Sequence, residues 1–365
     1  MSALIVCLAL LLPYALWTVA CSVALMRRRR LRSAVGNSAG CPVTAIVCTF
    51  RERRETVARC LASIVRAMGT DDRLIVITDH TPPDVTAWLA DTWQADSRVT
   101  IAANTAPQGK KHAQGMAVAL ARTETIVAID ADCQVGLHFF DTIRHAAPPS
   151  DFMLLLPVAM RGCGFVGKMM EMEFVCLQVI TSGSAILGRP TMANGAGMVF
   201  SRPLYMGHNP RHGFRSGDDM FLLGHAIATG AKVDYLADAV ALVETSAPSS
   251  VRAYVRQRAR WLGKAGGYSP TGGHGAVILL AWSVLAGVVA WPLAGVLAAF
   301  GLMGWGGAVA IFAIKLALDA FTFVAGRRML RSDAKAWLAL PLEVAYPLMT
   351  AVVGLRAAFF GRRGW

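Results

Sequence analysis

Uninterrupted apolar runs at both ends of the chain flank a middle region in which short apolar runs alternate with amphipathic stretches. Residues 1–26 contain no charged side chain, and long apolar runs return at about 276–297 and 308–324. Each run is long enough to cross about 30 Å of hydrocarbon as a helix. A last apolar segment, 337–360, contains two prolines, a glutamate and an arginine. It is therefore either a further span or a kinked, re-entrant or interfacial helix.

This pattern predicts five segments along the chain. They are an N-terminal transmembrane anchor (1–26), a basic linker (27–42), a globular domain (43–264), a glycine-rich linker (265–275) and a C-terminal membrane region (276–365). The four arginines at 27–30 follow the first apolar run, whereas a cleaved signal peptide carries its positive charge in front. The positive-inside rule then places the arginines and the globular domain in the cytoplasm.

Within 43–264 the apolar pattern changes repeatedly between strand and helix. Strands are expected at 43–50, 74–78, 99–102, 125–130, 198–200, 233–236 and 239–243, and helices at 51–68, 88–93, 108–122, 220–229 and 251–262. This alternation predicts right-handed βαβ units, and hence an α/β fold with a mainly parallel sheet. The methionine-rich stretch 165–186 suits either a core helix or a helix at the membrane surface that lines an acceptor path.

Composition supports a membrane protein with one globular domain. The chain has 365 residues, 55% of them hydrophobic, and a mean hydropathy of +0.47. Its net charge of +13 comes largely from arginines beside apolar segments, where they act as topology signals and attract anionic lipid. No aromatic-interleaved basic groove or recognition helix is evident, so nucleic-acid binding is not expected. The eight cysteines include no Cys-x-x-Cys pair, which indicates a reduced compartment.

Acidic residues follow two predicted strands and precede a predicted helix. Asp130 and Asp132 follow the apolar run 125–129, and Asp79 follows the run 74–78. Ligands bind at the carboxyl ends of strands in open α/β sheets. Two acids one residue apart can also face one Mg²⁺ or Mn²⁺, with substrate phosphates completing the coordination. A solvated acidic turn is the alternative interpretation of this pattern.

A second acid pair, Asp218-Asp219, follows a glycine at the start of a predicted helix. The two acids could cap that helix, or one could supply a general base. Small residues at 193–197 allow a close backbone approach to a ligand or form a simple loop.

Basic side chains stand at two further helices. Lys110 and Lys111 follow a glycine at a helix start, a place that favours an anionic ligand, although lysines on a solvated helix face are common. The helix 251–262 carries several arginines and Trp261. Arginine can bind pyrophosphate in a bidentate manner, while the indole can cover a sugar ring. The alternative for this helix is contact with lipid headgroups.

Together these motifs resemble the family 2 glycosyltransferases of GT-A fold. The resemblance is to the membrane-bound branch that includes cellulose, chitin and hyaluronan synthases and ceramide glucosyltransferase. It covers roughly 43–264, and Gln257-Arg258-Ala259-Arg260-Trp261 matches the Gln/Arg-x-x-Arg-Trp signature of the branch. It implies a Rossmann-like nucleotide-sugar-binding domain flanked by transmembrane helices, in an integral protein of the bacterial inner membrane.

On the donor side, the resemblance implies that Thr49 and Glu52 contact the nucleotide. Asp79 then corresponds to the acid that contacts uracil or ribose, and Lys110, or else Lys111, to the lysine beside the nucleotide. Family members usually have Asp-Asp-Gly/Ser where this chain has Thr78-Asp79-His80. This departure makes base recognition less certain.

At the reaction centre, Asp130 and Asp132 match the Asp-x-Asp motif, and Asp132 is the better metal ligand of the two. Asp219 corresponds to the catalytic base, and the pair Asp218-Asp219 stands where the family has Glu-Asp. Gln257, Arg260 and Trp261 would close over the diphosphate and the acceptor.

The expected function is an inverting, metal-dependent transfer of a sugar from a nucleotide-diphosphate sugar, preferentially a UDP-sugar, to a membrane lipid. Mg²⁺ or Mn²⁺ would be the cofactor, and the new bond a β-linkage. Few spans are available to enclose a translocation channel, so a lipid acceptor is favoured over a growing glycan. A processive polysaccharide synthase is the alternative within the enzyme class, and a non-catalytic membrane scaffold is the alternative outside it.

Overall fold

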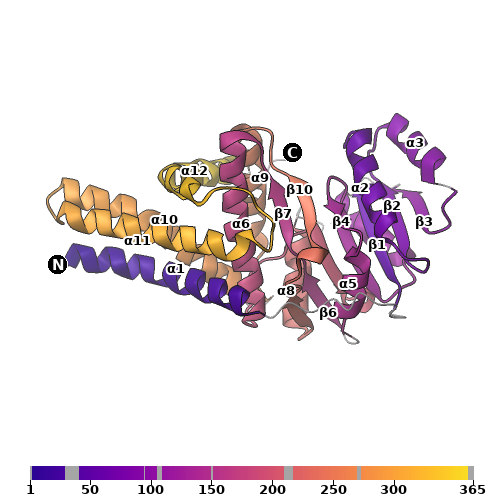
Figure 1. The fold of residues 1–365 in the computed structure, drawn as a ribbon, viewed down its shortest axis with the longest axis horizontal. Helices are drawn as coiled ribbons and strands as arrows, with labels where there is room; N and C mark the ends of the chain where they lie inside the picture. Colours follow the sequence, from indigo (N-terminus) through magenta and orange to yellow (C-terminus); the bar gives the residue numbers. More distant parts are fainter. Residues whose placement is uncertain are drawn as a thin grey trace. The chain divides into compact units, whose positions relative to one another are not determined.

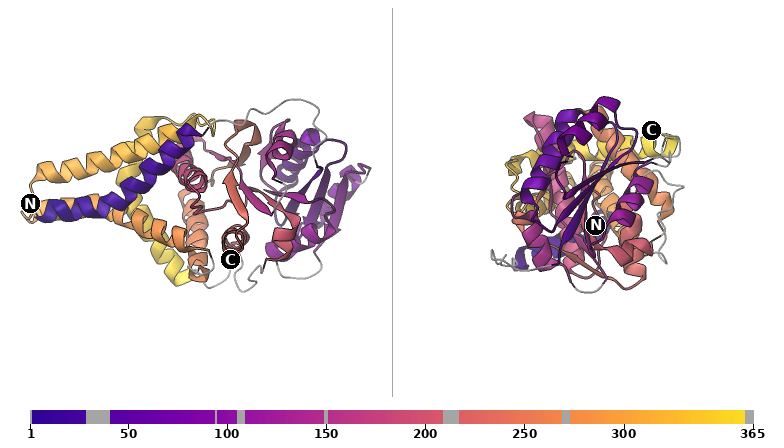
Figure 2. Two further views of the ribbon diagram at one scale, coloured as in Figure 1. Left: turned by 90° about the horizontal axis from the view of Figure 1, so that it is seen from below. Right: turned by 90° about the vertical axis from the view of Figure 1, so that its right-hand side faces the viewer.

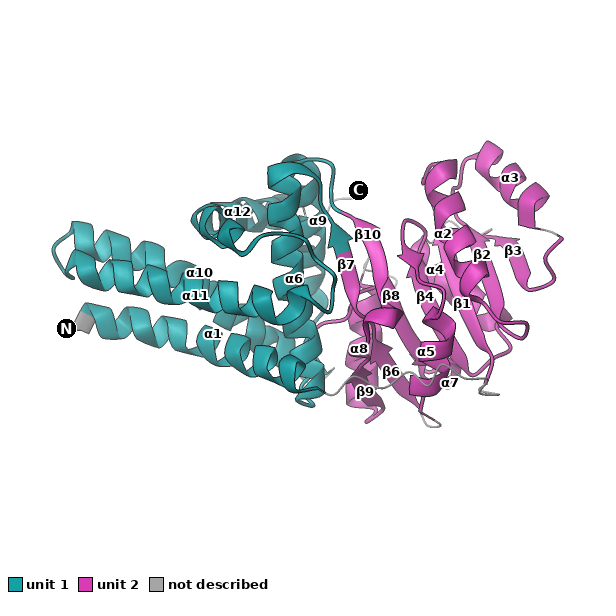
Figure 3. Ribbon diagram, in the orientation of Figure 1, with its two compact units in different colours: residues 1–28, 160–191, 247–365 teal, residues 29–159, 192–246 magenta. Residues whose placement is uncertain are grey.

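A computed structural model describes residues 2–28, 41–93, 95–104, 109–148, 151–208, 217–268 and 273–360. Most of the expected basic linker and part of the expected glycine-rich linker lie outside these ranges. The chain forms two compact units (Figure 3). Unit 1 comprises residues 1–28, 160–191 and 247–365, and unit 2 comprises 29–159 and 192–246.

Unit 2 is an α/β structure (Figure 1). Its strands are β1 (Val43–Thr49), β2 (Arg73–Thr78), β3 (Val99–Ala103), β4 (Thr125–Asp130), β5 (Gln134–Val135), β6 (Phe152–Leu155), β8 (Gly197–Ser201), β9 (Lys232–Tyr235) and β10 (Val243–Ser246), and β7 (Val158–Arg161) begins in it. Its helices are α2 (Arg54–Ala67), α3 (Pro83–Trp93), α4 (Lys110–Leu120), α5 (Phe139–Ala146), α7 (Arg202–Met206) and α8 (Asp218–Ala228).

The main sheet has seven strands in the order β3-β2-β1-β4-β8-β6-β9. Strands β3, β2, β1 and β4 are parallel, whereas β8 runs antiparallel to both β4 and β6. In the central register, Val47 of β1 lies between Val76 of β2 and Ile129 of β4. These side chains are buried, as expected for strands covered on both faces. The expected mainly parallel α/β sheet is confirmed.

Helices cover both faces of this sheet (Figure 2). The chain steps outwards from β1 to β2 and β3, and then returns across β1 to form β4. Because parallel crossovers are right-handed, this reversal puts α4 on the face opposite α2 and α3. The carboxyl ends of β1 and β4 meet where the winding reverses, and such a point is a common place for a ligand in open α/β sheets.

One expected strand is wrong. Residues 239–243 do not form a single strand, because Ala239–Ala241 is a 3₁₀ turn that precedes β10. The Asp238 side chain caps this turn by accepting a hydrogen bond from the Val240 amide at 2.9 Å. Strand β10 then pairs antiparallel with β5 in a second sheet of order β5-β10-β7. A local side-chain cap therefore overrides the β-branched pattern here.

Unit 1 is mainly helical. Its helices are α1 (Ser2–Arg27), α6 (Gly164–Ile186), α9 (Val251–Gly263), α10 (Gly275–Ala299), α11 (Trp305–Arg327) and α12 (Ala339–Phe360). Four stretches are long and apolar enough to cross a membrane: Ala3–Arg27, Gly275–Ala299, Trp305–Arg327 and Ala336–Phe359. The segment around α12 meets this criterion of length and hydropathy despite its prolines.

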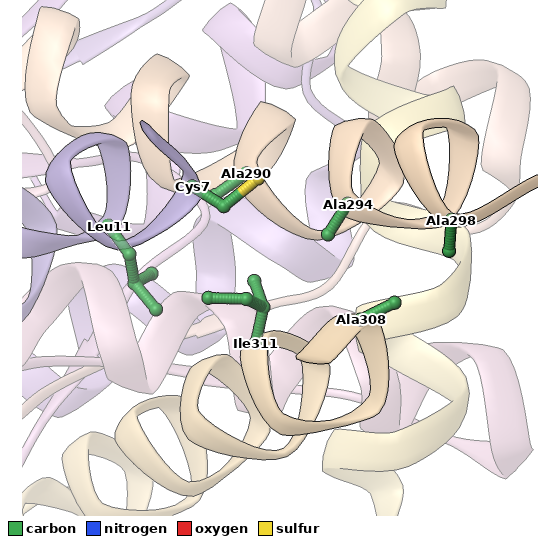
Figure 4. Close-up of a cluster of buried hydrophobic side chains, with 7 residues drawn as sticks. All are labelled: Cys7, Leu11, Ala290, Ala294, Ala298, Ala308 and Ile311. Carbon is green, nitrogen blue, oxygen red and sulfur yellow. The ribbon is translucent and has the colours of Figure 1, made fainter. Parts of the chain in front are cut away.

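Helices α1, α10 and α11 pack against one another (Figures 1 and 2). Their shared core consists of small and aliphatic side chains, shown in Figure 4: Cys7, Leu11, Ala290, Ala294, Ala298, Ala308 and Ile311. Small residues let helix backbones approach closely. A Cβ added at Gly287 of α10, for example, would lie 2.7 Å from Tyr14 Cγ of α1. This contact explains why glycine is needed at that position.

Helix α6 lies against α1 and α11 in unit 1, and most of its side chains from Met170 to Ala185 are buried. Gly183 meets the α1 backbone so closely that an added Cβ would lie 2.3 Å from Cys21 Cα. This packing favours the core-helix interpretation of 165–186.

Candidate active site

The carboxyl ends of β1, β2 and β4 bring three of the expected site residues to one edge of the sheet. Thr49 ends β1, Asp79 directly follows β2, and Asp130 ends β4. The Asp79 amide donates a hydrogen bond to the Thr49 carbonyl at 2.8 Å. The parallel order of the strands thus places residues from distant parts of the sequence side by side.

The Asp79 side chain is buried and lies 2.8 Å, Oδ1 to Nδ1, from His80. His80 has a φ of +53°, an unusual conformation for a residue other than glycine and one that recurs at functional sites. Its ring packs edge-on against Phe50, with ring centroids 5.8 Å apart. Glu52 Oε2 accepts a hydrogen bond from the Phe50 amide at 2.5 Å. The residues after β1 and β2 therefore form one connected group.

Lys110 forms the centre of a charged cluster in unit 2. It is the first residue of α4, after Gly109, whose φ of +75° favours glycine. Lys110 Nζ lies 2.5 Å from Asp130 Oδ1 and 3.7 Å from Asp218 Oδ2. The Lys110 side chain is still 39% exposed. It can therefore reach an anionic ligand as well as the two carboxylates.

Burial and nearby charges shift the pKa values of Asp130 and Lys110. Loss of hydration raises the pKa of Asp130 to about 6, and the negative charges of Asp132 and Asp218 act in the same direction against the opposing effect of Lys110. Burial would lower the pKa of Lys110, but the charges of Asp130 and Asp218 outweigh it and raise that pKa well above its usual value. In the described part of the cluster, one lysine thus contacts two carboxylates, those of Asp130 and Asp218.

Asp132 has the properties of a carboxylate available to a metal ion. Its side chain is exposed, and no basic group pairs with it among the residues that the structure describes. Its polar contacts are long, 3.4 Å from both Thr245 Oγ1 and Cys133 Sγ. In the described part of the chain, no three His, Cys, Asp or Glu side chains are grouped to hold a metal by themselves. This donor set fits Mg²⁺ or Mn²⁺ that is held by one or two carboxylates together with a diphosphate.

Asp218 and Asp219 are the first two residues of α8, and Gly217 before them has a φ of +98°. Asp219 Oδ1 accepts from the Met220 amide at 2.8 Å, and Oδ2 accepts from the Gly195 amide at 3.2 Å. A Cβ added at Gly195 would lie within 3.7 Å of carboxylate oxygens of both acids. The small-residue segment 193–197 therefore borders the acid pair, and it fixes the orientation of the Asp219 carboxylate.

The structure places the two candidate lysines differently. Lys110 contacts the acids, whereas Lys111 is buried with its Nζ 4.6 Å from the centre of the Phe221 ring. Adjacent helical residues point in different directions, so only one of the two can face the strand ends.

The remaining expected residues lie on α9 of unit 1. Gln257 is half-buried, Arg260 is exposed, and Trp261 is half-buried. Ser250 is the N-cap of this helix, and its side chain accepts a hydrogen bond from the Ala253 amide at 3.2 Å. The N-cap sets the start of α9, and the buried Tyr254 lies on the side of the helix that packs inside the protein.

Sequence reasoning missed two residues that contact expected site residues, and a third that pairs with one of these two. Thr245 contacts Asp132, as described above. Arg258 contacts Gln257 and Trp261, and Glu173 of α6 pairs with Arg258. Glu173 is one of two glutamates in the mainly apolar helix α6, and a charge in such a helix is the signal in the sequence that pointed to a partner.

Comparison with known proteins shows a family match and a similar fold. Residues 44–140 match the family model described as glycosyl transferase family 2. The mannosyltransferase PcManGT from Pyrobaculum calidifontis, solved in complex with GDP-Man and Mn²⁺, is similar in structure, with a TM-score of 0.60 and 17% identity over 98% of this chain and 99% of that one. GalNAc-T7 with UDP, GalNAc and Mn²⁺ gives a TM-score of 0.43 and 11% identity over 57% and 43% of the two chains. No curated protein sequence matches the chain.

The family match covers β1 to β4 and includes Thr49, Asp79, Lys110 and Asp132. The likeness to PcManGT shows the shared fold and confirms the expected GT-A architecture. The fold and the family match together support a glycosyltransferase with a family 2 domain.

Proposed function

We propose that the protein transfers a sugar from a nucleotide-diphosphate sugar to a membrane lipid, with inversion at the anomeric carbon. The observation that carries this proposal is the cluster of Lys110, Asp130 and Asp218 at the carboxyl ends of the sheet, with Asp219 beside it. It joins an anion-binding lysine, a cation-binding acid group and an oriented carboxylate. These are the elements that phosphate-linked group transfer requires.

On the donor side, the residues after β1 and β2 would bind the nucleotide, with Thr49 and Glu52 at the first strand and the buried Asp79 at the second. Asp132 and Asp130 would hold a divalent cation, either Mg²⁺ or Mn²⁺. When bound, such an ion neutralises negative charge on a diphosphate leaving group. A cation requirement is in line with PcManGT, whose structure contains Mn²⁺. Lys110 would stabilise the departing diphosphate from the protein side.

For the acceptor, Asp219 would take the proton from the attacking hydroxyl group. The two amide hydrogen bonds to its carboxylate, from Gly195 and Met220, orient it for this step. One displacement from the face opposite the leaving group gives a β-linkage from an α-linked donor. The resemblance of Gln257, Arg260 and Trp261 to the Gln/Arg-x-x-Arg-Trp signature supports a role of these α9 residues in binding the acceptor.

The long apolar helices of unit 1 support a lipid acceptor. Four stretches of the described chain are long and apolar enough to span a bilayer, so a lipid substrate would lie in the same phase as these helices. Four spans are few to enclose a channel for a growing polymer. The arginines at 27 and 28 after the first span support a cytoplasmic donor site in a bacterial inner membrane.

Release of nucleoside diphosphate by detergent-purified protein tests this function. Across a panel of sugar nucleotides, we expect release that requires both a membrane lipid extract and a divalent cation, and that stops with EDTA and resumes with Mn²⁺ or Mg²⁺. Release without lipid, with a product of high molecular weight, would instead indicate a polysaccharide synthase. Absence of release with every donor would contradict enzymatic function and favour a scaffold.

The Lys110→Met variant is expected to bind the sugar nucleotide about 10–100-fold more weakly, because a charge-assisted contact to the diphosphate is lost. Isothermal titration with the active donor and Mn²⁺ measures this. The matched control is Lys232→Met, since Lys232 is an exposed lysine of unit 2 at the start of β9. Equal donor affinity of the two variants would show that Lys110 does not contribute to donor binding.

A further inference from the structure

Arg258 is the most deeply buried arginine of α9, and it lies between two residues of the proposed acceptor site. Its side chain is only 9% exposed, although Arg256 and Arg260 on the same helix are exposed. Gln257 precedes it, and Trp261 follows it by almost one helical turn. The Gln/Arg-x-x-Arg-Trp signature leaves this position unspecified.

The Arg258 side chain contacts both neighbours. Its guanidinium carbon lies 4.2 Å from the centre of the Trp261 ring and 4.7 Å from that of Tyr254. Nη1 donates a hydrogen bond to Gln257 Oε1 at 3.3 Å. Nη2 donates to Glu173 Oε2 of α6, which is itself 6% exposed. One planar group therefore touches the indole and the amide at the same time, while a second helix anchors it.

Stability alone does not account for this arrangement. Apolar residues of similar volume can often replace a buried ion pair without loss of stability, because the pair must first be removed from water. Arg258 Nε is also buried without a hydrogen-bond partner among the described residues, which adds to that cost. A guanidinium can do what an apolar side chain cannot, because it stacks through its flat face and donates hydrogen bonds in its plane.

We propose that Arg258, anchored by Glu173, is a positioning residue that fixes Trp261 and Gln257 in the orientation that receives the polar group of the acceptor. This inference rests on the proposed function, in which both residues bind the acceptor. The ion pair sets the plane of the guanidinium. That plane in turn sets the tilt of the Trp261 ring and the direction of the Gln257 amide.

Substitution of Arg258 by lysine keeps the positive charge, but it removes the planar guanidinium group and leaves one donor nitrogen where there were several. We expect Arg258→Lys to raise the KM for the acceptor about tenfold or more, with the affinity for the sugar nucleotide unchanged. Glu173→Gln should act in the same direction, because the guanidinium loses its charged anchor. A loss of donor affinity equal to the loss for the acceptor would overturn the proposal.

Glu171 provides a matched control, since it is a buried glutamate two residues away on the same helix. Its carboxylate accepts from the Gly162 amide at 3.0 Å, Lys168 Nζ at 2.8 Å and Ser332 Oγ at 2.6 Å. Glu171→Gln should lower thermal stability and leave the KM for the acceptor unchanged. An equal rise of this KM in Glu171→Gln and Glu173→Gln would show a general effect of loosening α6, and would contradict a specific role of Arg258.

The decisive variant replaces the pair by apolar residues, Glu173→Leu with Arg258→Met. We expect the thermal midpoint to recover relative to the single variants, because no buried charge is left unpaired, while the KM for the acceptor stays raised. Recovery of both quantities would mean that the pair only supports the fold. Failure of the wild-type protein to transfer any sugar would instead contradict the proposed function, so the two failures are distinguishable.

A second readout does not depend on activity. Hydroxyl-radical footprinting with mass spectrometry measures the oxidation rate of Trp261 in the full chain. We expect this rate to rise in Arg258→Lys and in the apolar pair, because the ring loses the guanidinium that covers one face, and to stay at the wild-type value in Glu171→Gln. An unchanged rate in Arg258→Lys would show that Arg258 does not position the indole.

Discussion

The Asp219→Asn variant is expected to lose at least about 100-fold in turnover and to bind the sugar nucleotide as the wild type does. Asparagine keeps the size of the side chain and an oxygen that can accept from the Gly195 or Met220 amide. It cannot take a proton from the acceptor hydroxyl group. The loss should therefore appear in the chemical step, and single-turnover transfer with saturating donor and acceptor measures it.

The control for this variant is Asp84→Asn. Asp84 lies in the first turn of α3, as Asp219 lies in the first turn of α8, and it is exposed. Both substitutions weaken the interaction of an acid with a helix N-terminus to a similar extent. Unchanged turnover in Asp219→Asn would remove the general-base assignment, and an equal loss in Asp84→Asn would point to an effect on folding.

The second large effect is expected in the apolar helices of unit 1. Lys315 of α11 is buried, with its Nζ 2.7 Å from Asp319 Oδ2 and 3.0 Å from Glu343 Oε2 of α12. Tyr14 of α1 donates to Asp319 Oδ1 at 2.5 Å. Lys315→Met leaves two carboxyl groups without their counter-charge and should cost about 3–5 kcal/mol of stability. Denaturant titration in detergent micelles measures the loss.

Lys335→Met is the matched control, because Lys335 is an exposed lysine between α11 and α12. Its effect on the same titration should stay within about 0.5 kcal/mol. Restoring stability by combining Lys315→Met with Asp319→Asn and Glu343→Gln would show that the unpaired charges caused the loss. Equal stability of Lys315→Met and the wild type would mean that the cluster does not hold α1, α11 and α12 together.

The sequence indicated most of the elements and the composition of the candidate site, because these depend on local patterns. The buried run 125–129 predicted β4, and the acids after it were expected at a ligand-binding edge. The strand expected at 239–243 is wrong because the Asp238 side chain caps a turn there, and this cap outweighs the β-propensity of a few residues. Periodicity could not decide whether Lys110 or Lys111 faces the acids, because the answer depends on where α4 packs.

The sequence alone determined those features that are encoded within a few neighbouring residues. They are the apolar stretches that can span a bilayer, the strands that end in acids, and the glycines at helix starts. Only the tertiary structure decided which distant side chains meet. Glu173 and Arg258 are 85 positions apart, and Lys315 and Glu343 are 28 apart. A charged residue in an apolar helix indicates that a partner is needed, since an unpaired buried charge is costly. Only the packing of the helices determines which residue is that partner.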